Sequence, residues 1–138
     1  MNFARRLIID TGVLVSAAIR PGSVPAVAFE RALRHFDVCA SVATLGELDS
    51  LLLRPKFDVY ASIQLRMAFC SSFRERVLII EPTDIVTDCS DPGDNKFLSL
   101  ALVAEAELII ASDPHLTALH PWRGIPILPP AAFLVGVR

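Results

Sequence analysis

Short runs of consecutive apolar residues recur along the chain, and each is followed by a segment with the pattern of a helix. Because the runs do not alternate with polar residues, they are typical of strands covered on both faces. Four runs and a brief fifth one are predicted as strands: 6–9, 36–40, 77–80, 108–111 and 126–128. Strands that alternate with helices pair in parallel through right-handed crossovers. The sequence therefore predicts an α/β fold, a three-layer α/β/α sandwich around a mainly parallel sheet of four to five strands.

The expected helices are marked by residues that favour helix ends. Ser23 and Ser41 can each cap a helix through the side-chain oxygen, and Pro25 suits a first helical turn. Pro55 lies just beyond the end of the helix that Ser41 begins. We expect helical segments at 13–19, 23–34, 42–53, 59–76, 94–105, from about 113, and at 130–135, with a polar loop at 81–92.

The length and the spread of turn residues indicate one domain. The chain has 138 residues, close to the commonest domain size. Prolines and glycines fall between apolar segments rather than in one linker, and no internal repeat stands out. With 53% hydrophobic residues the chain can bury a substantial core. We therefore expect a single domain that spans residues 1–138.

The apolar segments are too short for a membrane protein. Charges or prolines break each run before the roughly 18–20 residues that a spanning helix needs. The run 7–9 ends at Asp10, which is too short for the core of a signal peptide. Cys39, Cys70 and Cys89 lack the close spacing of a metal knuckle, so we interpret them as reduced core thiols. We expect a cytoplasmic protein without a membrane span.

The charge balance limits how this chain can act on nucleic acid. The formal net charge is −2 and the isoelectric point is near 5.9. A protein that binds nucleic acid through counterion release is usually basic. Any work on nucleic acid must therefore rely on a local device, such as a bound metal ion, rather than on a basic surface.

Acidic residues stand where the predicted strands end. Asp10 ends the first strand, and Asp113 follows the fourth. Asp94 opens the helix after the third strand, and Glu47 lies on the helix after the second. Sites in open α/β sheets form at the carboxyl ends of the strands, so these four acids should share one edge. Clustered carboxylates repel unless a cation neutralises them, and Mg²⁺ prefers oxygen ligands and phosphates. This arrangement suits phosphodiester hydrolysis.

Each acid also has a simpler interpretation. Asp10 and Asp113 can cap the helices that follow them, and Asp94 can favour a helix N-terminus by its charge. Glu47 can be an ordinary solvated helix position. Four independent caps on one edge are less probable than one shared site. Lys96 stands beside Asp94, where it would lie near a bound phosphate.

Other chemistries fit the sequence poorly. No cysteine stands beside a histidine at the expected edge, which argues against thiol catalysis, and no Gly-x-Gly-x-x-Gly follows the first strand. A haloacid-dehalogenase-like phosphatase needs Asp-x-Asp after its first strand, whereas Asp10 is followed by Thr11 and Gly12. A response-regulator receiver needs paired acids before its first helix, and the sequence has none there.

Four segments, taken together, resemble the PIN domain, the nuclease fold of VapC-like toxins in toxin–antitoxin pairs. The order and spacing match over nearly the whole chain, and the third segment is the most specific. The segments are Leu7-Ile8-Ile9-Asp10-Thr11, Ser41 to Leu48 followed by Leu53-Arg54-Pro55-Lys56-Phe57, Asp91-Pro92-Gly93-Asp94-Asn95-Lys96-Phe97-Leu98, and Ile109-Ile110-Ala111-Ser112-Asp113.

The resemblance implies a Mg²⁺- or Mn²⁺-dependent endoribonuclease with an antitoxin protein as partner, and a homodimer. It implies that Asp10, Asp94 and Asp113 hold the metal. Glu47 would then orient or deprotonate the attacking water, and the products would carry 5′-phosphate and 3′-hydroxyl ends. The expected substrate-binding residues are Thr11, Lys96 and Ser112, and the expected supporting residues are Asp91 and Asn95.

The chain departs from the family pattern at two places. Gly12 stands where the family usually has asparagine, and Ala111-Ser112-Asp113 stands where it more often has Thr-Gly-Asp. These departures leave open an alternative, a catalytically idle PIN-fold binding module that acts through a protein or RNA partner. They do not touch the four acids.

Overall fold

The fold is built on a parallel sheet whose central strands are buried, whereas the edge strand formed by Leu78 and Ile79 is exposed. The structure is a computed structural model that describes residues 5–136. Its strands are β1 (Arg6–Ile9), β2 (Asp37–Ala40), β3 (Leu78–Ile79), β4 (Leu108–Ile110) and β5 (Ile127–Leu128). They form one sheet in the order β3-β2-β1-β4-β5, and every adjacent pair is parallel. The predicted α/β fold with a parallel sheet of four to five strands is confirmed.

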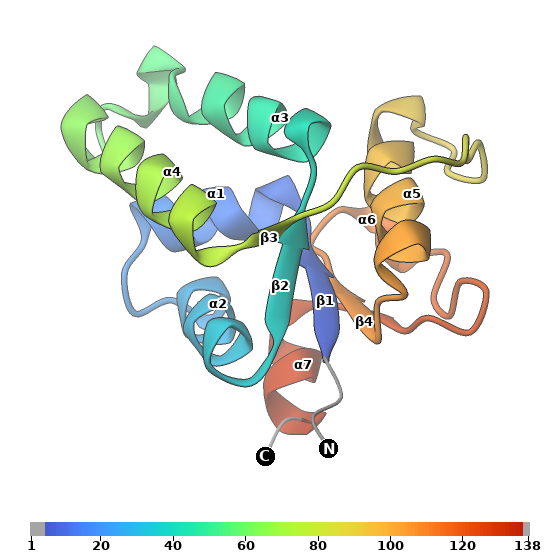
Figure 1. Cartoon of the computed structure of the whole chain (residues 1–138). Helices are drawn as coiled ribbons and strands as arrows, with labels where there is room; N and C mark the ends of the chain where they lie inside the picture. The colour runs from blue at the N-terminus through green and yellow to red at the C-terminus, as the bar shows by residue number, and fades with distance from the viewer. Residues whose placement is uncertain (1–4, 137–138) are drawn as a thin grey trace.

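Helices connect the strands in the order that the sequence predicts. The α-helices are α1 (Thr11–Ile19), α2 (Val24–His35), α3 (Val42–Leu52), α4 (Ile63–Arg76), α5 (Asn95–Ala104), α6 (Pro114–Thr117) and α7 (Pro130–Gly136), and the 3-10 helices are η1 (Pro55–Phe57) and η2 (Pro92–Asp94). The helices α1 to α4 lie on one side of the sheet, and α5 and α6 lie on the other (Figure 1).

Alternate residues of the central strand feed two separate cores. Leu7 and Ile9 of β1 belong to the larger core, which they share with residues of α1, α2, α3, α4 and α7. Ile8 belongs to the smaller core, with residues of α5 and α6 and with the buried Trp122. Side chains on a strand point alternately to opposite faces, so a run of consecutive apolar residues fills both cores. This explains the unbroken apolar character of the strands.

Two helix starts differ from the expected ones. The helix expected from Val59 begins at Ile63, because Ser62 caps it by accepting a hydrogen bond from the Leu65 N–H at 3.2 Å. Val59 is instead 84% exposed, in the connection after η1. The helix expected from residue 13 begins two residues earlier, because Asp10 supplies its cap. Both corrections follow from local capping, which hydrophobic pattern alone does not reveal.

Among the described residues, none of the helices alone has the length and apolar character that crossing a membrane requires. The bent pair α1 and α2, with an angle of 109° between them, meets that test of length and composition only when the two are taken together.

Candidate metal centre

Asp10 joins the carboxyl ends of the two central strands. Its side chain is only 2% exposed. Oδ1 accepts a hydrogen bond from the Val13 N–H at 2.9 Å, which caps α1. Oδ2 accepts from the N–H groups of Ser112 at 2.9 Å and Asp113 at 3.1 Å, just beyond β4. Burial raises the pKa of the Asp10 carboxyl above its ordinary value, although these three N–H groups act to lower it.

An acidic cleft of about 440 Å³ opens beside Asp10. It is lined from the ends of β1 and β4 and from α1, α3, α5 and α6. The polar lining residues include all four acids that the sequence places at this edge. The cleft is lined by Asp10, Thr11, Gly12, Glu47, Leu51, Asp91, Asp94, Phe97, Ser112, Asp113, Pro114 and His115.

Asp94 lies in surroundings that disfavour a negative charge. Its side chain is 8% exposed, and its buried Oδ2 has no hydrogen-bond partner among residues 5–136. Burial, the hydrogen bond with Asp113 and the negative charges of Asp113, Asp91 and Glu47 raise the pKa of Asp94 to about 7. Below about pH 7, a protonated Asp94 therefore lies beside an ionised Asp113.

Asp113 is held in the charged form by its neighbours. Burial acts to raise the pKa of Asp113, but hydrogen bonds from Asp94 and His115 outweigh it and bring that pKa below its usual value. Asp113 Oδ1 accepts from the His115 N–H at 2.8 Å and lies 3.1 Å from the His115 Nδ1. Asp94 and Asp113 thus share one proton where two negative charges would repel.

The residues of the cleft fit a divalent cation. One ligand atom from each of Asp91, Asp94, Asp113 and His115 lies within 4.8 Å of the others. Two ligands on opposite sides of one small cation lie about 4.0–4.4 Å apart, so small side-chain rotations would bring this set together. A cation would also satisfy the buried Asp94 Oδ2 and replace the shared proton. Asp10 is not one of the four, because both of its oxygens face backbone N–H groups; its predicted role as a direct ligand stays a prediction.

Glu47 faces the cleft from α3 and is held there by two donors. Its Oε2 accepts a hydrogen bond from the Thr11 hydroxyl. Its Oε1 accepts from Lys96 Nζ at 3.0 Å, and the same ammonium donates to the Gly93 carbonyl at 2.6 Å. Lys96 therefore lies among the acids as a counter-charge, with a side chain that is 27% exposed.

The supporting residues named from the sequence shape the loop before α5. Asp91 Oδ1 accepts from the Gly93 N–H at 3.0 Å and opens η2. Asn95 Oδ1 accepts from the Cys89 N–H at 2.8 Å, which fixes the incoming chain. His115 is not among the site residues that the sequence predicts, but the structure places it in the cleft. Its place in the first turn of α6, two residues after Asp113, is the signal that connects it to the cluster.

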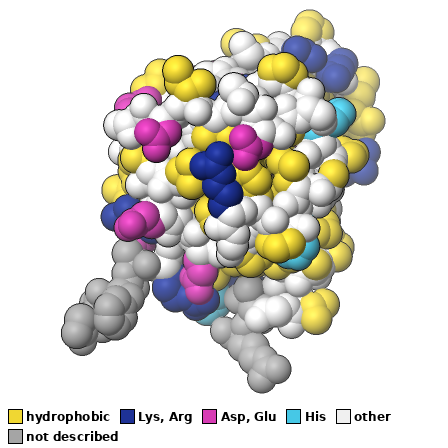
Figure 2. Space-filling view, turned by 90° about the vertical axis from the view of Figure 1, so that its right-hand side faces the viewer, with side chains coloured by type: hydrophobic (Ala, Val, Ile, Leu, Met, Phe, Trp, Pro, Cys, Tyr) yellow, Lys and Arg dark blue, Asp and Glu magenta, His cyan; other side chains and the backbone are white. Residues whose placement is uncertain are grey.

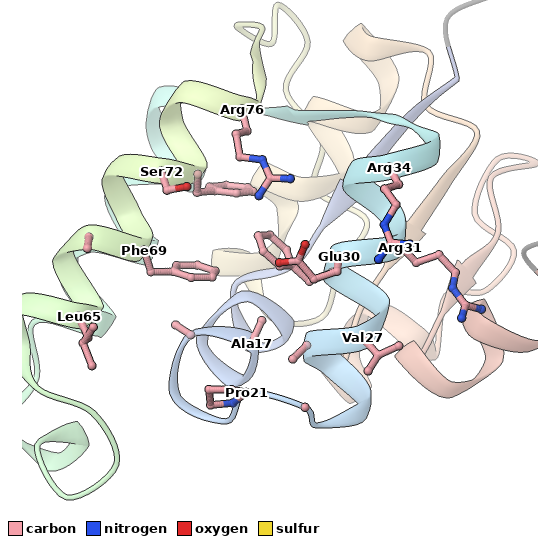
Figure 3. Close-up of a pocket in the computed structure, with 16 residues that line it drawn as sticks. Ala17, Pro21, Val27, Glu30, Arg31, Arg34, Leu65, Phe69, Ser72 and Arg76 are labelled. Atoms are coloured by element: carbon pink, nitrogen blue, oxygen red, sulfur yellow. The ribbon is translucent and has the colours of Figure 1, made fainter.

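A larger hollow lies away from the acids, between α4 and the pair α1 and α2. It has a volume of about 730 Å³. Phe69 points into it from α4, Ala17 and Val27 line it from α1 and α2, and Arg34 and Arg76 stand at its edge (Figure 3). We call this hollow the apolar groove. The acidic cleft and the apolar groove are thus distinct cavities, and the charged residues that line the groove are Glu30, Arg31, Arg34 and Arg76.

Fold and site together define a three-layer α/β protein with an acidic cleft at the carboxyl ends of its parallel strands. A sequence model of the PIN domain matches residues 6–115. The chain belongs to the PIN domain family.

Relatives and solved structures agree with this assignment. An uncharacterized protein of Methanocaldococcus jannaschii is 30% identical over 120 residues, which cover 83% of this chain and 75% of the relative. PAE2754 from Pyrobaculum aerophilum has a TM-score of 0.65 at 11% identity, covering 96% of this chain and 97% of its own.

Two further solved structures share the fold as well. VapBC2 from Rickettsia felis, solved bound to a DNA fragment from its promoter, gives a TM-score of 0.59 at 12% identity, with 88% of this chain and 96% of that chain covered. VapC20 of Mycobacterium tuberculosis, a toxin that cleaves the sarcin-ricin loop, has a TM-score of 0.58 at 15% identity. The match covers 87% of this chain and 98% of VapC20. At these identities the likeness concerns the fold.

Proposed function

We propose that this protein is a metal-dependent endoribonuclease and the toxin of a toxin–antitoxin pair. The observation that carries the proposal is a group of Asp91, Asp94, Asp113 and His115 in a cleft at the end of the sheet, in which Asp94 Oδ2 is buried and accepts no hydrogen bond from the described residues. Membership of the PIN domain family and the shared fold with VapC20 support the choice of RNA as substrate.

Asp94 and Asp113 would hold Mg²⁺ or Mn²⁺, with Asp10 keeping the two strand ends in register behind them. A cation at this place polarises a phosphate oxygen and lowers the pKa of a bound water. Each oxygen of Glu47 accepts one hydrogen bond, from Thr11 or from Lys96, and keeps a further lone pair. Glu47 can therefore orient the attacking water and accept its proton.

Three polar residues of the cleft are proposed to contact the RNA. Lys96 is the basic side chain nearest the acids, and a phosphate could take over one of its hydrogen bonds. The hydroxyls of Thr11 and Ser112 line the same cleft. Elsewhere on the surface, the face drawn in Figure 2 carries acidic and basic side chains interspersed rather than one basic field. That face therefore offers no extended basic surface, and the proposal places the RNA contacts at the metal centre.

The apolar groove is the proposed docking place of an antitoxin. Its floor is apolar, with Phe69 and Phe73 from α4 facing Phe29 of α2. Among residues 5–136, neither Arg34 nor Arg76 at its rim forms an ion pair. An amphipathic helix with acidic residues beside its apolar face matches this surface. The VapBC2 structure of Rickettsia felis supports a protein partner of this kind. The homodimer that the family resemblance implies belongs to the same proposal, and light scattering of the purified protein tests it.

Cleavage of a labelled structured RNA tests the nuclease proposal. Purified protein is assayed with Mg²⁺, with Mn²⁺ and with EDTA, beside the variant Asp10→Asn. We expect cleavage with either cation, none with EDTA, and 5′-phosphate and 3′-hydroxyl product ends. Metal binding by calorimetry without cleavage of any of several RNAs would contradict the nuclease proposal and favour the idle binding module.

A charge reversal tests the docking proposal separately. Arg34→Glu combined with Arg76→Glu should weaken binding of the protein encoded by the neighbouring gene by at least about tenfold, because opposite charges at an interface become like charges. RNA cleavage should stay unchanged, since the groove is separate from the acidic cleft. Unchanged partner binding would remove the groove from the interface.

A further inference from the structure

The acidic cleft holds one nitrogen donor that a magnesium site does not need. We propose that His115 is a direct metal ligand, which makes the centre a set of three carboxylates and one imidazole that binds Mn²⁺ in preference to Mg²⁺. This inference deepens the proposed function, because it concerns the same metal centre. It names both the further ligand and the kind of cation, a first-row divalent transition metal.

His115 lies close to three carboxylates of the cleft. One of its ring nitrogens lies within 4.8 Å of carboxylate oxygens of Asp91, Asp94 and Asp113. The ring is 54% exposed, so it can turn without disturbing the core. Proline at the start of α6 and the cap from Asp113 fix the backbone of this turn, which keeps the imidazole at the mouth of the cleft. The imidazole thus stands where a cation seated on Asp94 and Asp113 would still have an open position.

A buried oxygen of Asp94 independently supports a bound cation. The Oδ2 atom is buried, and none of the described residues donates a hydrogen bond to it. A buried polar atom without a partner is costly unless an ion or a water satisfies it. Because Asp94 belongs to the same four-residue group as His115, a cation bound by the Asp94 carboxylate would also lie close to the imidazole. A cluster of surface acids would not leave such an atom buried.

The chemistry of the donor set decides which cation fits. Mg²⁺ prefers oxygen ligands in near-ideal octahedral geometry and keeps several of its waters. Affinity for nitrogen-containing sites rises along the transition series from Mn²⁺ to Cu²⁺, and imidazole is among the ligands that these ions favour. One imidazole in place of a water should therefore strengthen Mn²⁺ binding and leave Mg²⁺ binding nearly unchanged.

An alternative role for His115 is to position Asp113. The backbone N–H and the ring of His115 both approach Asp113 Oδ1, at 2.8 and 3.1 Å. A histidine that only orients this carboxylate would affect every cation equally, because its contribution comes through Asp113. The two roles therefore differ in metal selectivity.

Binding of Mn²⁺ and Mg²⁺ to wild-type protein and to His115→Gln distinguishes the roles. The control is His35→Gln, which removes an exposed histidine at the end of α2. We expect His115→Gln to raise the Kd for Mn²⁺ by at least about tenfold. We expect the Kd for Mg²⁺ to change by less than about threefold, and His35→Gln to change neither. Circular dichroism establishes that each variant is folded.

Pulsed electron paramagnetic resonance of the Mn²⁺-loaded protein adds a readout that does not depend on activity. We expect a ¹⁴N coupling from a directly bound imidazole in the wild type and its loss in His115→Gln. Mn²⁺ binding without that coupling, or equal weakening of both cations, would overturn the inference and leave the metal centre standing. Absence of Mn²⁺ binding to the wild type would overturn both the inference and the metal centre of the proposed function.

Discussion

At the scale of single residues, the two departures from the family pattern explain each other. A side chain at position 12 would run into the Ser112 hydroxyl, because a Cβ built on Gly12 overlaps Ser112 Oγ. The family usually has the larger residue at position 12 and glycine at position 112, and this chain has the reverse. The space between β1 and β4 holds one side chain, and here Ser112 supplies it. The departures therefore form a paired exchange rather than two independent losses.

A double-mutant cycle tests this pairing. In the single variant Gly12→Ala, the new Cβ forces the Ser112 side chain to rotate. In the double variant with Ser112→Gly, that hydroxyl is gone and the Cβ no longer overlaps it. We expect the two substitutions to couple by about 0.5–3 kcal/mol in the free energy of unfolding, as contacting residues do. Urea denaturation of the two single variants and the double variant measures the coupling. Additive effects would show that the two positions do not share this space.

The raised pKa of Asp94 predicts how the metal-free protein depends on pH. An unfolded aspartate has a pKa of about 3.9, whereas burial raises that of Asp94 to about 7 in the folded state. The folded state therefore binds more protons between these values, and its stability falls as the pH rises from about 4 to about 7. Asparagine cannot ionise, so the Asp94→Asn variant does not lose stability in this way as the pH rises.

Melting temperatures in EDTA test this expectation. The advantage of Asp94→Asn over the wild type should grow between pH 5 and pH 8, because the wild type must then ionise a buried carboxyl. Excess Mg²⁺ should shrink the advantage, since the cation stabilises only the wild type. A difference between the two proteins that stays constant from pH 5 to pH 8 would contradict the raised pKa.

At the scale of elements, a buried arginine fixes the connection between α3 and α4. Arg66 is fully buried on α4. Its guanidinium donates to the Leu52, Arg54 and Ala61 carbonyls at 2.7, 3.0 and 3.1 Å, and it forms an ion pair with Asp58. All four partners belong to the segment 52–61. The Arg66 side chain therefore fixes the connection between α3 and α4. Through that connection it fixes the position of α3, which carries Glu47.

Replacement of this arginine should cost far more than replacement of an exposed one. Arg66→Met leaves buried carbonyls unpaired, and we expect a loss of about 3–5 kcal/mol in the free energy of unfolding. Arg74→Met is the matched control on the same helix, because its pair with Asp49 at 2.5 Å is 42% and 32% exposed. We expect that control to lose less than about 1 kcal/mol. Similar losses in urea denaturation would mean that Arg66 does not hold the connection.

The elements were predictable from sequence to the extent that local chemistry determines them. The five predicted strands are present in one sheet, and Ser23 and Ser41 cap their helices as predicted. Four of the strands carry buried apolar residues, whereas Leu78 and Ile79 of the edge strand β3 are 40% and 51% exposed. The start of α4 was wrong because Val59 and Tyr60 are apolar but exposed. Apolar pattern cannot distinguish a buried helical residue from one that lies on a loop.

For the site, the sequence predicts which strand ends carry the acidic residues. Strand order and parallel pairing bring Asp10, Asp94 and Asp113 to one edge. The hydrogen bonds inside the cleft were not predictable. Asp10 faces backbone N–H groups and Lys96 pairs with Glu47 only because segments far apart in sequence meet there. Sequence spacing carries no information about such contacts.

At the scale of the whole molecule, the charge balance predicts weak salt dependence. With 13 basic and 15 acidic residues, this protein cannot neutralise many phosphates at once. We expect about one or two phosphate contacts, so RNA affinity should fall by less than about tenfold between 50 and 200 mM salt. Removal of the divalent cation should weaken binding more than the change in salt does. Filter binding in Mg²⁺ and in EDTA at both salt concentrations measures this, and a loss of about a thousandfold or more with salt would indicate an extended basic surface instead.

We propose that the acidic cleft cuts RNA with the help of a bound metal ion. The single-turnover cleavage rate of Asp94→Asn relative to the wild type, in saturating Mg²⁺, tests it most directly. Asparagine keeps the shape and can still donate a hydrogen bond to Asp113, so a folded variant isolates the loss of one ligand charge. We predict a fall in rate of at least about a hundredfold, and a folded Asp94→Asn protein that cleaves at the wild-type rate would contradict the account.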